Sequence, residues 1–397
     1  MTSETADTPA RLTDGPTDHA LRDKPALLRT LDDLACRIED QLQALYPPTP
    51  EGDHLTDLTS SAPSWDALAP AQQQQTRSRL HDALTTPVRH LIEAGGQRWR
   101  HGLMLVAIEV LGGDSEHFAP LAASVEAMHT GSLMVDDVED DAVLRRGRPS
   151  AHHVYGTSVA LNAGTAAYFA FDTAIRTTAA HDPVLRAGLY ETYLAALRAA
   201  HAGQGLDVRG HREEMERTLG GGCPQELLAC VRLAHQLKSG AVVGASLRMA
   251  GQVVAAGETT CAALFAFGSA VGTAYQITDD VADLRGAQRG GRATKRVGED
   301  LHNGKVTMPL AHAVRLLPAD EAARMWGRVR DATADEETVA AIRARLEGCG
   351  ALDACMADAE DLLASTWRDL EPLLPRSPRT ELMWEMARHV VSSHRIA

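Results

Sequence analysis

The chain has 397 residues, of which 44% are apolar and only 4% aromatic, and its formal net charge is −14. That acidic balance disfavours a nucleic-acid partner, because binding to a phosphate backbone needs an excess of Lys and Arg. The six cysteines form no CxxC pair, so a zinc site or disulfide framework is unsupported and reduced thiols are expected. The polar, acidic N-terminus does not resemble a signal peptide, and no uncharged apolar run reaches transmembrane length. A cytoplasmic protein is therefore expected.

The first part of the chain has little helical pattern. Residues 1–25 are rich in Thr, Asp and Pro, a helical periodicity runs over 26–45, and 46–75 is predicted to be loop. We therefore expect residues 1–75 to form a largely disordered N-terminal extension with one amphipathic helix. Residues 76–397 are expected to form a single domain.

From residue 76 onward, amphipathic helical patterns succeed one another between short Gly, Pro or Asp turns. No stretch alternates convincingly as a strand, so the predicted fold class is an all-α bundle. The predicted helices span 77–94, 99–111, 117–142, 158–179, 184–206, 225–255, 259–285, 308–316, 319–330, 336–347, 351–371 and 379–393.

A cluster of charged side chains stands out at residues 129–153. Asp136, Asp137 and Asp140 have a DDxxD spacing, which on a helix places the first and last one turn apart on the same face. Like charges at that spacing repel, and divalent cations such as Mg2+ are one way to accommodate them. A solvated acidic helix face explains this one cluster equally well. Guanidinium groups that suit diphosphate oxygens follow at once: Arg145, Arg146 and Arg148.

A second DDxxD occurs far along the chain, at Asp279, Asp280 and Asp283. Apolar residues flank this copy, so a purely solvated face is harder to defend. Two acidic turns facing the inside of an apolar bundle would be costly unless they bound metal ions and an anionic ligand. The pair therefore favours a site for metal ions and phosphate groups over a solvated surface.

Four further stretches carry candidate chemistry, and each has an ordinary structural alternative. GGQRWR (95–100) places Arg98 and Arg100 at an anion-binding turn, although such turns are common. GQGLD (203–207) by itself is only a helix end. Lys238 and Ser239 lie in an apolar helix, where a lone lysine more often reaches the surface. The last stretch, 295–309, is either a solvated loop or a basic one that acts through Lys295, Arg296 and Lys305.

Together these stretches resemble the trans-isoprenyl diphosphate synthases, the polyprenyl synthetase family. GGQRWR corresponds to the family motif GGKRLRP, and DDVED, RRG and GQGLD follow in the family's order. Farther along, KS corresponds to the family's KT, YQITDDVAD to FQxxDDxxD and GKVTMP to GKxTxP. The similarity covers roughly residues 77–395 and is closest to geranylgeranyl diphosphate synthases of the eukaryotic type. It implies an isoprenoid-synthase helical bundle around a central cavity, with the two DDxxD motifs on facing helices, and a homodimer.

The resemblance also implies a role for each candidate residue. Three Mg2+ ions are expected on Asp136, Asp140 and Asp279, with Asp137, Asp280 and Asp283 as further ligands or as supports for the ligands. The allylic diphosphate is expected at Arg145, Lys238, Ser239, Lys295 and Lys305, with Gln276 assisting near the allylic cation. Isopentenyl diphosphate is expected at Gln97, Arg100, His129 and Arg146. The expected reaction ionises the allylic substrate, condenses it with isopentenyl diphosphate and eliminates a proton.

Product length follows from the helix geometry around the first motif. The growing chain should run from Asp136 past the residues one and two turns earlier, Ser132 and Met128, with Gly131 beside them. Small residues there leave the path open, so bulky residues deeper in the cavity are needed to stop the growth of the chain; we call them the floor. The resemblance places that floor at Tyr168, Phe169 and His201, although these are equally consistent with ordinary core residues. A C20 product is therefore expected over C15 or C30.

One departure from the family pattern keeps other functions open. Gln97 replaces the lysine that normally contacts isopentenyl diphosphate, a loss that Arg98, Arg100, His129 or Arg146 could compensate. A terpene cyclase on the same fold would need no such lysine, but Arg146, Lys295 and the GKVTMP loop argue against it. A non-catalytic partner subunit is disfavoured because both DDxxD motifs are intact. A nucleotide-binding function lacks a P-loop or Rossmann fingerprint.

Overall fold

The computed structural model describes residues 24–50, 62–286, 288–289, 292–293, 297–331 and 335–392. Most of them lie in helices, so the predicted all-α fold class is confirmed. The helices up to residue 209 are α1 (Lys24–Leu45), α3 (Pro70–Leu80), η1 (His81–Thr85), α4 (Thr86–Ile92), α5 (Trp99–Val110), α6 (Ala119–Glu139), α7 (Ala151–Tyr155), α8 (Thr157–Ala167), α9 (Ala170–Thr178) and α10 (Pro183–Arg209).

The remaining helices complete the bundle. They are α11 (Arg212–Leu219), α12 (Pro224–His235), η2 (Gln236–Gly240), α13 (Ala241–Val253), α14 (Glu258–Arg285), α15 (Glu299–His302), α16 (Met308–Leu316), α17 (Ala319–Gly327), α18 (Glu336–Gly348), α19 (Ala351–Leu370), η3 (Glu371–Leu373) and α20 (Pro378–Ser392). Two short antiparallel hairpins accompany them, β1 (Leu144–Arg145) with β2 (Arg148–Pro149) and β3 (Gln288–Arg289) with β4 (Arg292–Ala293).

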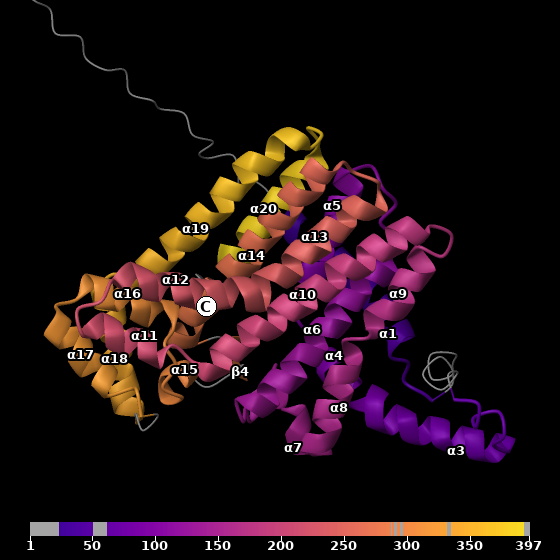
Figure 1. Ribbon diagram of the computed structural model, residues 1–397, viewed down its shortest axis with the longest axis horizontal. Coiled ribbons are helices and arrows are strands. Elements are labelled where there is room, and N and C mark those ends of the chain that lie inside the picture. The colour runs from indigo at the N-terminus through magenta and orange to yellow at the C-terminus, as the bar shows by residue number, and fades with distance from the viewer. Residues whose placement is uncertain are drawn as a thin grey trace, which may run out of the picture.

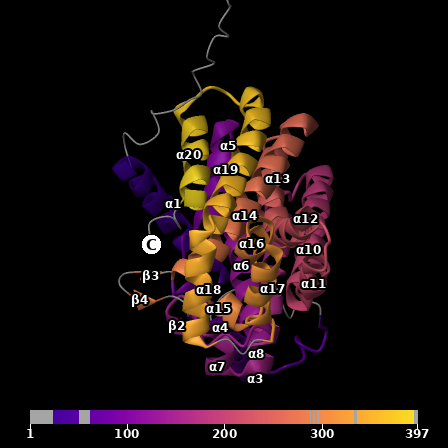
Figure 2. The ribbon, with the colours of Figure 1, turned by 90° about the vertical axis from the view of Figure 1, so that its left-hand side faces the viewer.

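Helix α14 is the central element of the bundle. It packs along α13 and α19, and α10 packs against α13 in turn (Figure 1). Helix α6 packs against α8, α9, α5 and α1. The shorter helices α11 and α15 to α18 gather at one end, which faces the viewer in Figure 2. Among the described residues, the buried apolar side chains form one core that extends from α1 to α20.

Local signals fix where several helices begin. Pro183 and Pro224 start α10 and α12 at the first helical position, where a missing N–H costs nothing. Asp182 caps α10, since its Oδ1 accepts hydrogen bonds from the next free amides of the helix, at 3.0 and 2.9 Å. Asp335 caps α18 in the same way through the amide of Thr338, at 2.8 Å. These caps orient the helices that the predicted periodicity identifies.

Small residues allow three helical segments to approach closely around η2. A Cβ at Gly203 of α10 would lie 2.2 Å from the backbone nitrogen of Lys238. A Cβ at Gly272 of α14 would lie 2.6 Å from the carbonyl oxygen of Ser239. The segment between them, η2, is a single π-helical turn, a distortion often found at functional sites. Lys238 and Ser239 are thus held between α10 and α14 by backbone contact.

Helix α1 confirms the predicted amphipathic helix near the N-terminus, and it belongs to the bundle. Ile38 and Leu42 are fully buried, against α5 and α6. Arg89 of α4 donates from Nη1 to Gln43 at 3.0 Å and also to the backbone oxygen of Tyr46. Residues 1–23 and 51–61 of the expected extension lie outside the described residues. The domain division at residue 75 stays a prediction.

The structure differs from the predicted elements in several places, among them the short helices α7 and α15, which no predicted helix covers. The predicted loop over 46–75 is wrong from Pro70 onward, where α3 begins with proline at its first position. The predicted helix 158–179 is interrupted at residues 168–169, between α8 and α9. Helix α11 is missed, because its sequence is mostly charged and buries only Met215 and Thr218. The hairpins are missed because strands of two residues have no alternation to detect.

We predict that Gly203→Ala destabilises the fold, because the added methyl group would overlap the backbone of η2. Overpacking of this kind costs about 1–3 kcal/mol. Urea unfolding measures the loss. Gly205→Ala on the same helix is the matched control, since nothing lies within 4 Å of its Cβ position. Equal stability of the two variants would contradict the close contact between α10 and η2.

Candidate active site

A cavity of about 550 Å³ inside the bundle is bordered by both acidic motifs. Asp136 and Asp140 come from the end of α6, and Asp279 and Asp280 from α14. The predicted convergence of the two motifs on one cavity is therefore confirmed. The other sequence-predicted residues on its wall are Gln97, Arg100, Met128, His129, Ser132, Arg145, Arg146, Tyr168, His201, Lys238, Ser239, Gln276 and Lys305.

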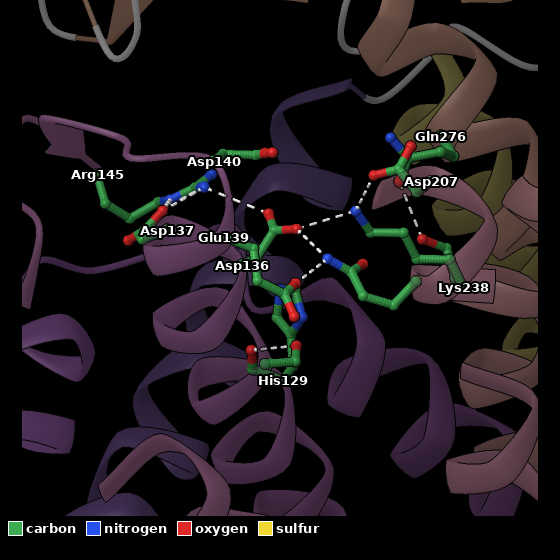
Figure 3. Close-up of polar contacts among 12 residues, drawn as sticks. His129, Asp136, Asp137, Glu139, Asp140, Arg145, Asp207, Lys238 and Gln276 are labelled. Atoms are coloured by element: carbon green, nitrogen blue, oxygen red, sulfur yellow. Dashed lines mark hydrogen bonds and ion pairs between the residues drawn. The ribbon is translucent and has the colours of Figure 1, made fainter. Parts of the chain in front are cut away.

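Asp136 contacts three polar side chains around this wall (Figure 3). Its Oδ1 accepts hydrogen bonds from Lys238 Nζ at 3.0 Å and from Gln204 Nε2 at 2.9 Å, and Arg145 lies 3.5 Å from Oδ2. Burial alone would raise the pKa of Asp136, but Lys238, Arg145 and Gln204 hold the pKa below its ordinary value. The side chain is therefore an ionised group facing the cavity.

Asp137, the next residue, orients Arg145 instead of facing the cavity. Its side chain is only 1% exposed and does not line the cavity. Its Oδ1 accepts a hydrogen bond from Arg145 Nε at 2.6 Å. Burial raises the pKa of Asp137, although Arg145 opposes that shift. Asp137 therefore fixes the direction of Arg145, which in turn faces Asp136.

Two lysines neutralise the carboxylates around the cavity mouth. Lys238 Nζ lies 2.8 Å from Asp207 Oδ2 as well as 3.0 Å from Asp136. Lys305 Nζ donates to both oxygens of Asp140, at 2.8 and 3.0 Å, and lies 3.9 Å from Asp207. Burial would lower the pKa of Lys238 and of Lys305, but the carboxylates raise both above the ordinary value. Both lysines are therefore fully charged.

The second acidic motif divides its three aspartates between the cavity and the backbone behind it. Asp279 lines the cavity. Asp280 accepts a hydrogen bond from the amide of Met308 at 2.9 Å, and burial raises its pKa well above the ordinary value. Asp283 does not line the cavity, and its Oδ2 accepts from the amide of Asp300 at 3.3 Å. Asp280 and Asp283 thus hold the segment that carries Lys305.

The hairpin β1–β2 presents Arg145 and Arg146 to the cavity. Arg146 and Gly147 have φ angles of 53° and 76°, as the two central residues of a type I′ turn require. Arg146 Nη1 donates to the carbonyl of Leu91 at 3.1 Å, and Nη2 lies 3.6 Å from Glu126. Burial lowers the pKa of Arg146 to about 10, and Glu126 opposes the shift. The guanidinium therefore remains charged at neutral pH.

Arg98, a candidate compensating cation from GGQRWR, is paired within the protein. Its side chain is 3% exposed, and Nη1 donates to Glu126 Oε1 at 2.5 Å while Nη2 donates to the carbonyl of Ile92 at 2.7 Å. Nη2 also lies 3.5 Å from Glu39 of α1. Both terminal nitrogens of the guanidinium therefore have protein partners, and Arg98 also borders the cavity, so its compensating role stays a prediction.

Arg100 and His129 form the other cationic side of the cavity with Arg146. The Arg100 guanidinium stacks 4.4 Å from the ring centre of Trp99 and 5.0 Å from that of Tyr275. Burial lowers the pKa of Arg100, and burial together with Arg100 holds the pKa of His129 well below its ordinary value. His129 is therefore neutral. Gln97 lies on the same wall, where the resemblance predicts a lysine.

The residues predicted to control product length are only partly in the cavity. Met128, Ser132, Tyr168 and His201 line it, and the rings of Tyr168 and His201 meet edge to face at 5.5 Å. Phe169 does not, because the break between α8 and α9 turns it outward and leaves it 73% exposed. Gly131 also lies elsewhere. A Cβ there would be 2.3 Å from the carbonyl of Gly164, so this glycine permits close packing of α6 on α8.

Several residues of the site escaped the sequence prediction. Asp207 and Gln204 belong to the GQGLD segment, whose acidic and amide groups were the available signal. Ser239 donates to Gln276 Oε1 at 2.9 Å, which places the predicted pair together. Glu126 is a lone carboxylate in an apolar helix, a pattern that signals a buried ion pair. Lys295 lies outside the described residues, so its placement stays a prediction.

The donor set of the wall fits a hard divalent cation. Asp136, Asp140 and Asp279 supply carboxylate oxygens, the ligands that Mg2+ prefers, and Asp207 adds another beside them. Lysine and arginine groups surround these carboxylates, so an anion can enter together with the metal. An apolar wall extends from this polar mouth through Met128, Leu133, Leu197 and Val242.

The fold and the site together define an all-α enzyme that handles a diphosphate joined to an apolar chain. The model of the family "Polyprenyl synthetase" matches residues 81–346. The chain belongs to the polyprenyl synthetase family.

Named relatives agree with this assignment. The chain is 30% identical to a short chain isoprenyl diphosphate synthase of Methanothermobacter thermautotrophicus, over 74% of this chain and 85% of the relative. It is 28% identical to geranylgeranyl pyrophosphate synthase 2 of Zymoseptoria tritici, over 68% and 75%. A crystal structure of polyprenyl synthase from Caulobacter crescentus shares the fold, with a TM-score of 0.71, 24% identity and coverage of 93% and 97%.

We predict that Glu126→Ala strongly destabilises the protein. The change leaves Arg98 buried without its main carboxylate partner, which typically costs about 3–5 kcal/mol. Glu93→Ala is the control, because Glu93 pairs with Arg89 at the surface, where such pairs contribute about 1 kcal/mol or less. Chemical denaturation of both variants measures the difference. Equal losses of unfolding free energy in the two variants would show that the buried Arg98–Glu126 pair matters no more to stability than a surface ion pair.

Proposed function

We propose that this prenyltransferase condenses isopentenyl diphosphate with an allylic diphosphate, head to tail and in trans, with Mg2+ as cofactor. The observation that carries the proposal is the wall of the cavity, where carboxylates from α6 and α14 alternate with Lys238, Lys305 and Arg145. A diphosphate that arrives with divalent cations satisfies both signs of charge. The apolar wall beyond is suited to a hydrocarbon chain.

Metal binding is assigned to Asp136, Asp140 and Asp279, with three ions as the family resemblance implies. Bound there, Mg2+ would polarise the diphosphate of the allylic substrate and neutralise the charge that develops on it. Asp137 and Asp283 support this set from behind the wall, through Arg145 and the amide of Asp300, and Asp280, which also borders the cavity, holds the amide of Met308.

The chain's own cations act on the leaving group. Lys238, Lys305 and Arg145 donate hydrogen bonds to the diphosphate as the allylic C–O bond breaks, which stabilises the charge where it develops. The Ser239 hydroxyl and the Gln276 amide face the cavity beside this point, and their dipoles assist the allylic cation. Apolar side chains exclude water, which would otherwise capture that cation.

Isopentenyl diphosphate is assigned to Arg100, Arg146, His129 and Gln97. Two guanidinium groups can bind its diphosphate oxygens, and a neutral His129 can donate one hydrogen bond. The C4 carbon of isopentenyl diphosphate then attacks the allylic cation and forms the new C–C bond. The proton lost from C2 passes to the released diphosphate, which leaves an allylic product one isoprene unit longer.

We propose geranylgeranyl diphosphate, C20, as the product, made from a dimethylallyl, geranyl or farnesyl primer. The support is the cavity path along α6, in which Ser132 and Met128 leave room below Asp136. Tyr168 and His201 also meet on this wall, and Tyr193 donates a hydrogen bond to the Tyr168 carbonyl. These aromatic groups form the proposed floor.

A terpene cyclase on the same fold is the alternative function. It would ionise an allylic diphosphate but would need no second diphosphate site. Arg100 and Arg146 both line the cavity and are separate from Lys238 and Lys305, the lysines that contact the first acidic motif. This second cationic group favours condensation. The carboxylates of both motifs on one wall likewise favour a catalyst over a non-catalytic partner subunit.

We propose a homodimer that assembles through the apolar face of α9 and α10. Phe169 just before α9, and Leu194 and Val208 on one face of α10, are exposed, and a second copy of the chain would cover them. Light scattering of the purified chain measures the mass of the assembly.

We also propose a cytoplasmic location. The described chain has one helix long and apolar enough to span a membrane, α14, and 61% of its apolar window is buried in the core.

We predict that Asp136→Ala and Asp279→Ala each lower turnover by a factor on the order of 10² or more, because each removes a carboxylate from the metal site. Thermal unfolding should show an intact fold. The assay supplies Mg2+ and dimethylallyl, geranyl or farnesyl diphosphate, with and without isopentenyl diphosphate, and products are identified by mass. Chain extension supports the proposal, whereas a cyclised hydrocarbon or no product contradicts it. Asp361→Ala, an exposed carboxylate on α19, is the control and should retain full turnover.

We predict that Ser132→Phe shortens the product, because a phenyl ring would fill the path one turn below Asp136. Tyr168→Ala should have the opposite effect and lengthen the product, since it removes part of the proposed floor. Chromatography of the dephosphorylated products measures both shifts. An unaltered product distribution in both variants would refute the direction of the path.

A further inference from the structure

Three metal-binding side chains meet outside the cavity, at the two ends of the arginine hairpin. Asp141 directly follows α6, and His152 and His153 lie in α7. One ligand atom from each of the three lies within 4.8 Å of the others. None of the three lines the cavity. The hairpin that carries Arg145 and Arg146 therefore starts and ends at the same cluster.

His152 is the unusual member of this cluster. Its side chain is only 7% exposed, and neither ring nitrogen has a hydrogen-bond partner in the described part of the chain. Its Nε2 points toward Asp141 Oδ1 at 3.8 Å, which is too long for a hydrogen bond. Buried polar nitrogens are normally paired, so an imidazole left in this state needs a ligand.

His153 completes the group from the surface side. Its ring lies against that of His152, with centroids 4.2 Å apart and planes inclined by 39°. His153 and Asp141 are both exposed, so their side chains can turn without disturbing the core. Tetrahedral coordination at about 2.0 Å requires ligand atoms about 3.3 Å apart, so binding from the present separations of up to 4.8 Å needs these two exposed side chains to rotate.

We propose that Asp141, His152 and His153 bind one divalent transition-metal ion, such as Zn2+ or Co2+. Two imidazole nitrogens and one carboxylate suit such ions, whereas Mg2+ prefers oxygen ligands alone. Three protein ligands leave a fourth position for water. The site is distinct from the proposed Mg2+ site, because its ligands lie outside the cavity.

The bound ion would close residues 142–151 into a loop with fixed ends. The hairpin is held by the side chains of Arg145 and Arg146 and by backbone contacts, among them the bond from the Ser150 amide to the Val143 carbonyl at 3.0 Å. His90 Nε2 also lies 2.9 Å from the carbonyl of Pro149. A metal clamp would hold Arg145 and Arg146 in their places on the cavity wall. This consequence rests on the proposed function, but the binding site itself does not.

The test uses the full chain saturated with Mg2+, so that the acidic motifs are filled before Co2+ is added. Visible absorption of Co2+ and calorimetry with Zn2+ measure binding. We expect one site in the wild-type chain, with affinity reduced at least about 10-fold by His153→Ala, which removes an exposed ligand and leaves the core intact. His117→Ala, which removes an exposed imidazole elsewhere, should bind like the wild type.

A second readout identifies the ligands. Electron paramagnetic resonance of bound Cu2+ should show coupling to two imidazole nitrogens in the wild type and to one in His153→Ala. Asp141→Asn should weaken binding while retaining both nitrogens. Binding that is absent in the presence of Mg2+, or equal in His153→Ala and His117→Ala, would overturn the proposal. Neither readout depends on turnover, so failure of the proposed function would leave the result for the metal site unaffected.

Discussion

The site depends on opposite charges that compensate one another inside an apolar bundle. The Lys238 ammonium lies between Asp136 and Asp207, and Lys305 lies between Asp140 and Asp207. An unpaired charge at this depth would cost several kcal/mol, so each lysine must have a carboxylate when no ligand is bound. A diphosphate with its cations can replace these partners, because its oxygens accept from lysine while the metal takes the carboxylates. The same groups thus stabilise the fold and prepare the site.

The backbone explains why this network forms where it does. Lys238 lies in a π-helical turn between α10 and α14, which Gly203 and Gly272 allow to approach. The sequence predicts the helix around Lys238 but not the π-turn, because the apolar periodicity continues through it. The acidic motifs are easier to predict, since paired aspartates in an apolar pattern already violate the expected distribution of charge. Asp207 has only the weaker signal of its place in GQGLD, because one aspartate near a helix end is typical of any helix.

Residues 168 and 169 show that the sequence does not predict which of two neighbouring side chains points into the cavity. Tyr168 lines the cavity and Phe169 is exposed, although both were predicted to cap the same path. A step of one residue on a helix turns the side chain by about 100°, so two neighbours seldom reach the same cavity. The helix break between α8 and α9 sets which of them points inward, and nothing in the apolar pattern fixes that break to one residue. Arg98 and Arg100 separate for a similar reason, since Arg98 has a φ of 50° and turns toward Glu126.

The hairpin β1–β2 links the two halves of the proposed reaction. Arg145 faces Asp136 and Asp137, on the side assigned to the allylic diphosphate, whereas Arg146 faces Glu126, on the side assigned to isopentenyl diphosphate. A type I′ turn at Arg146 and Gly147 directs these adjacent side chains to different partners. In the proposed reaction, one backbone turn would therefore set the separation between the two diphosphates, and with it the approach of C4 to the allylic carbon. Because a misplacement of about 1 Å can cost about 10²-fold in rate, the rigidity of this turn matters as much as the charges that it carries.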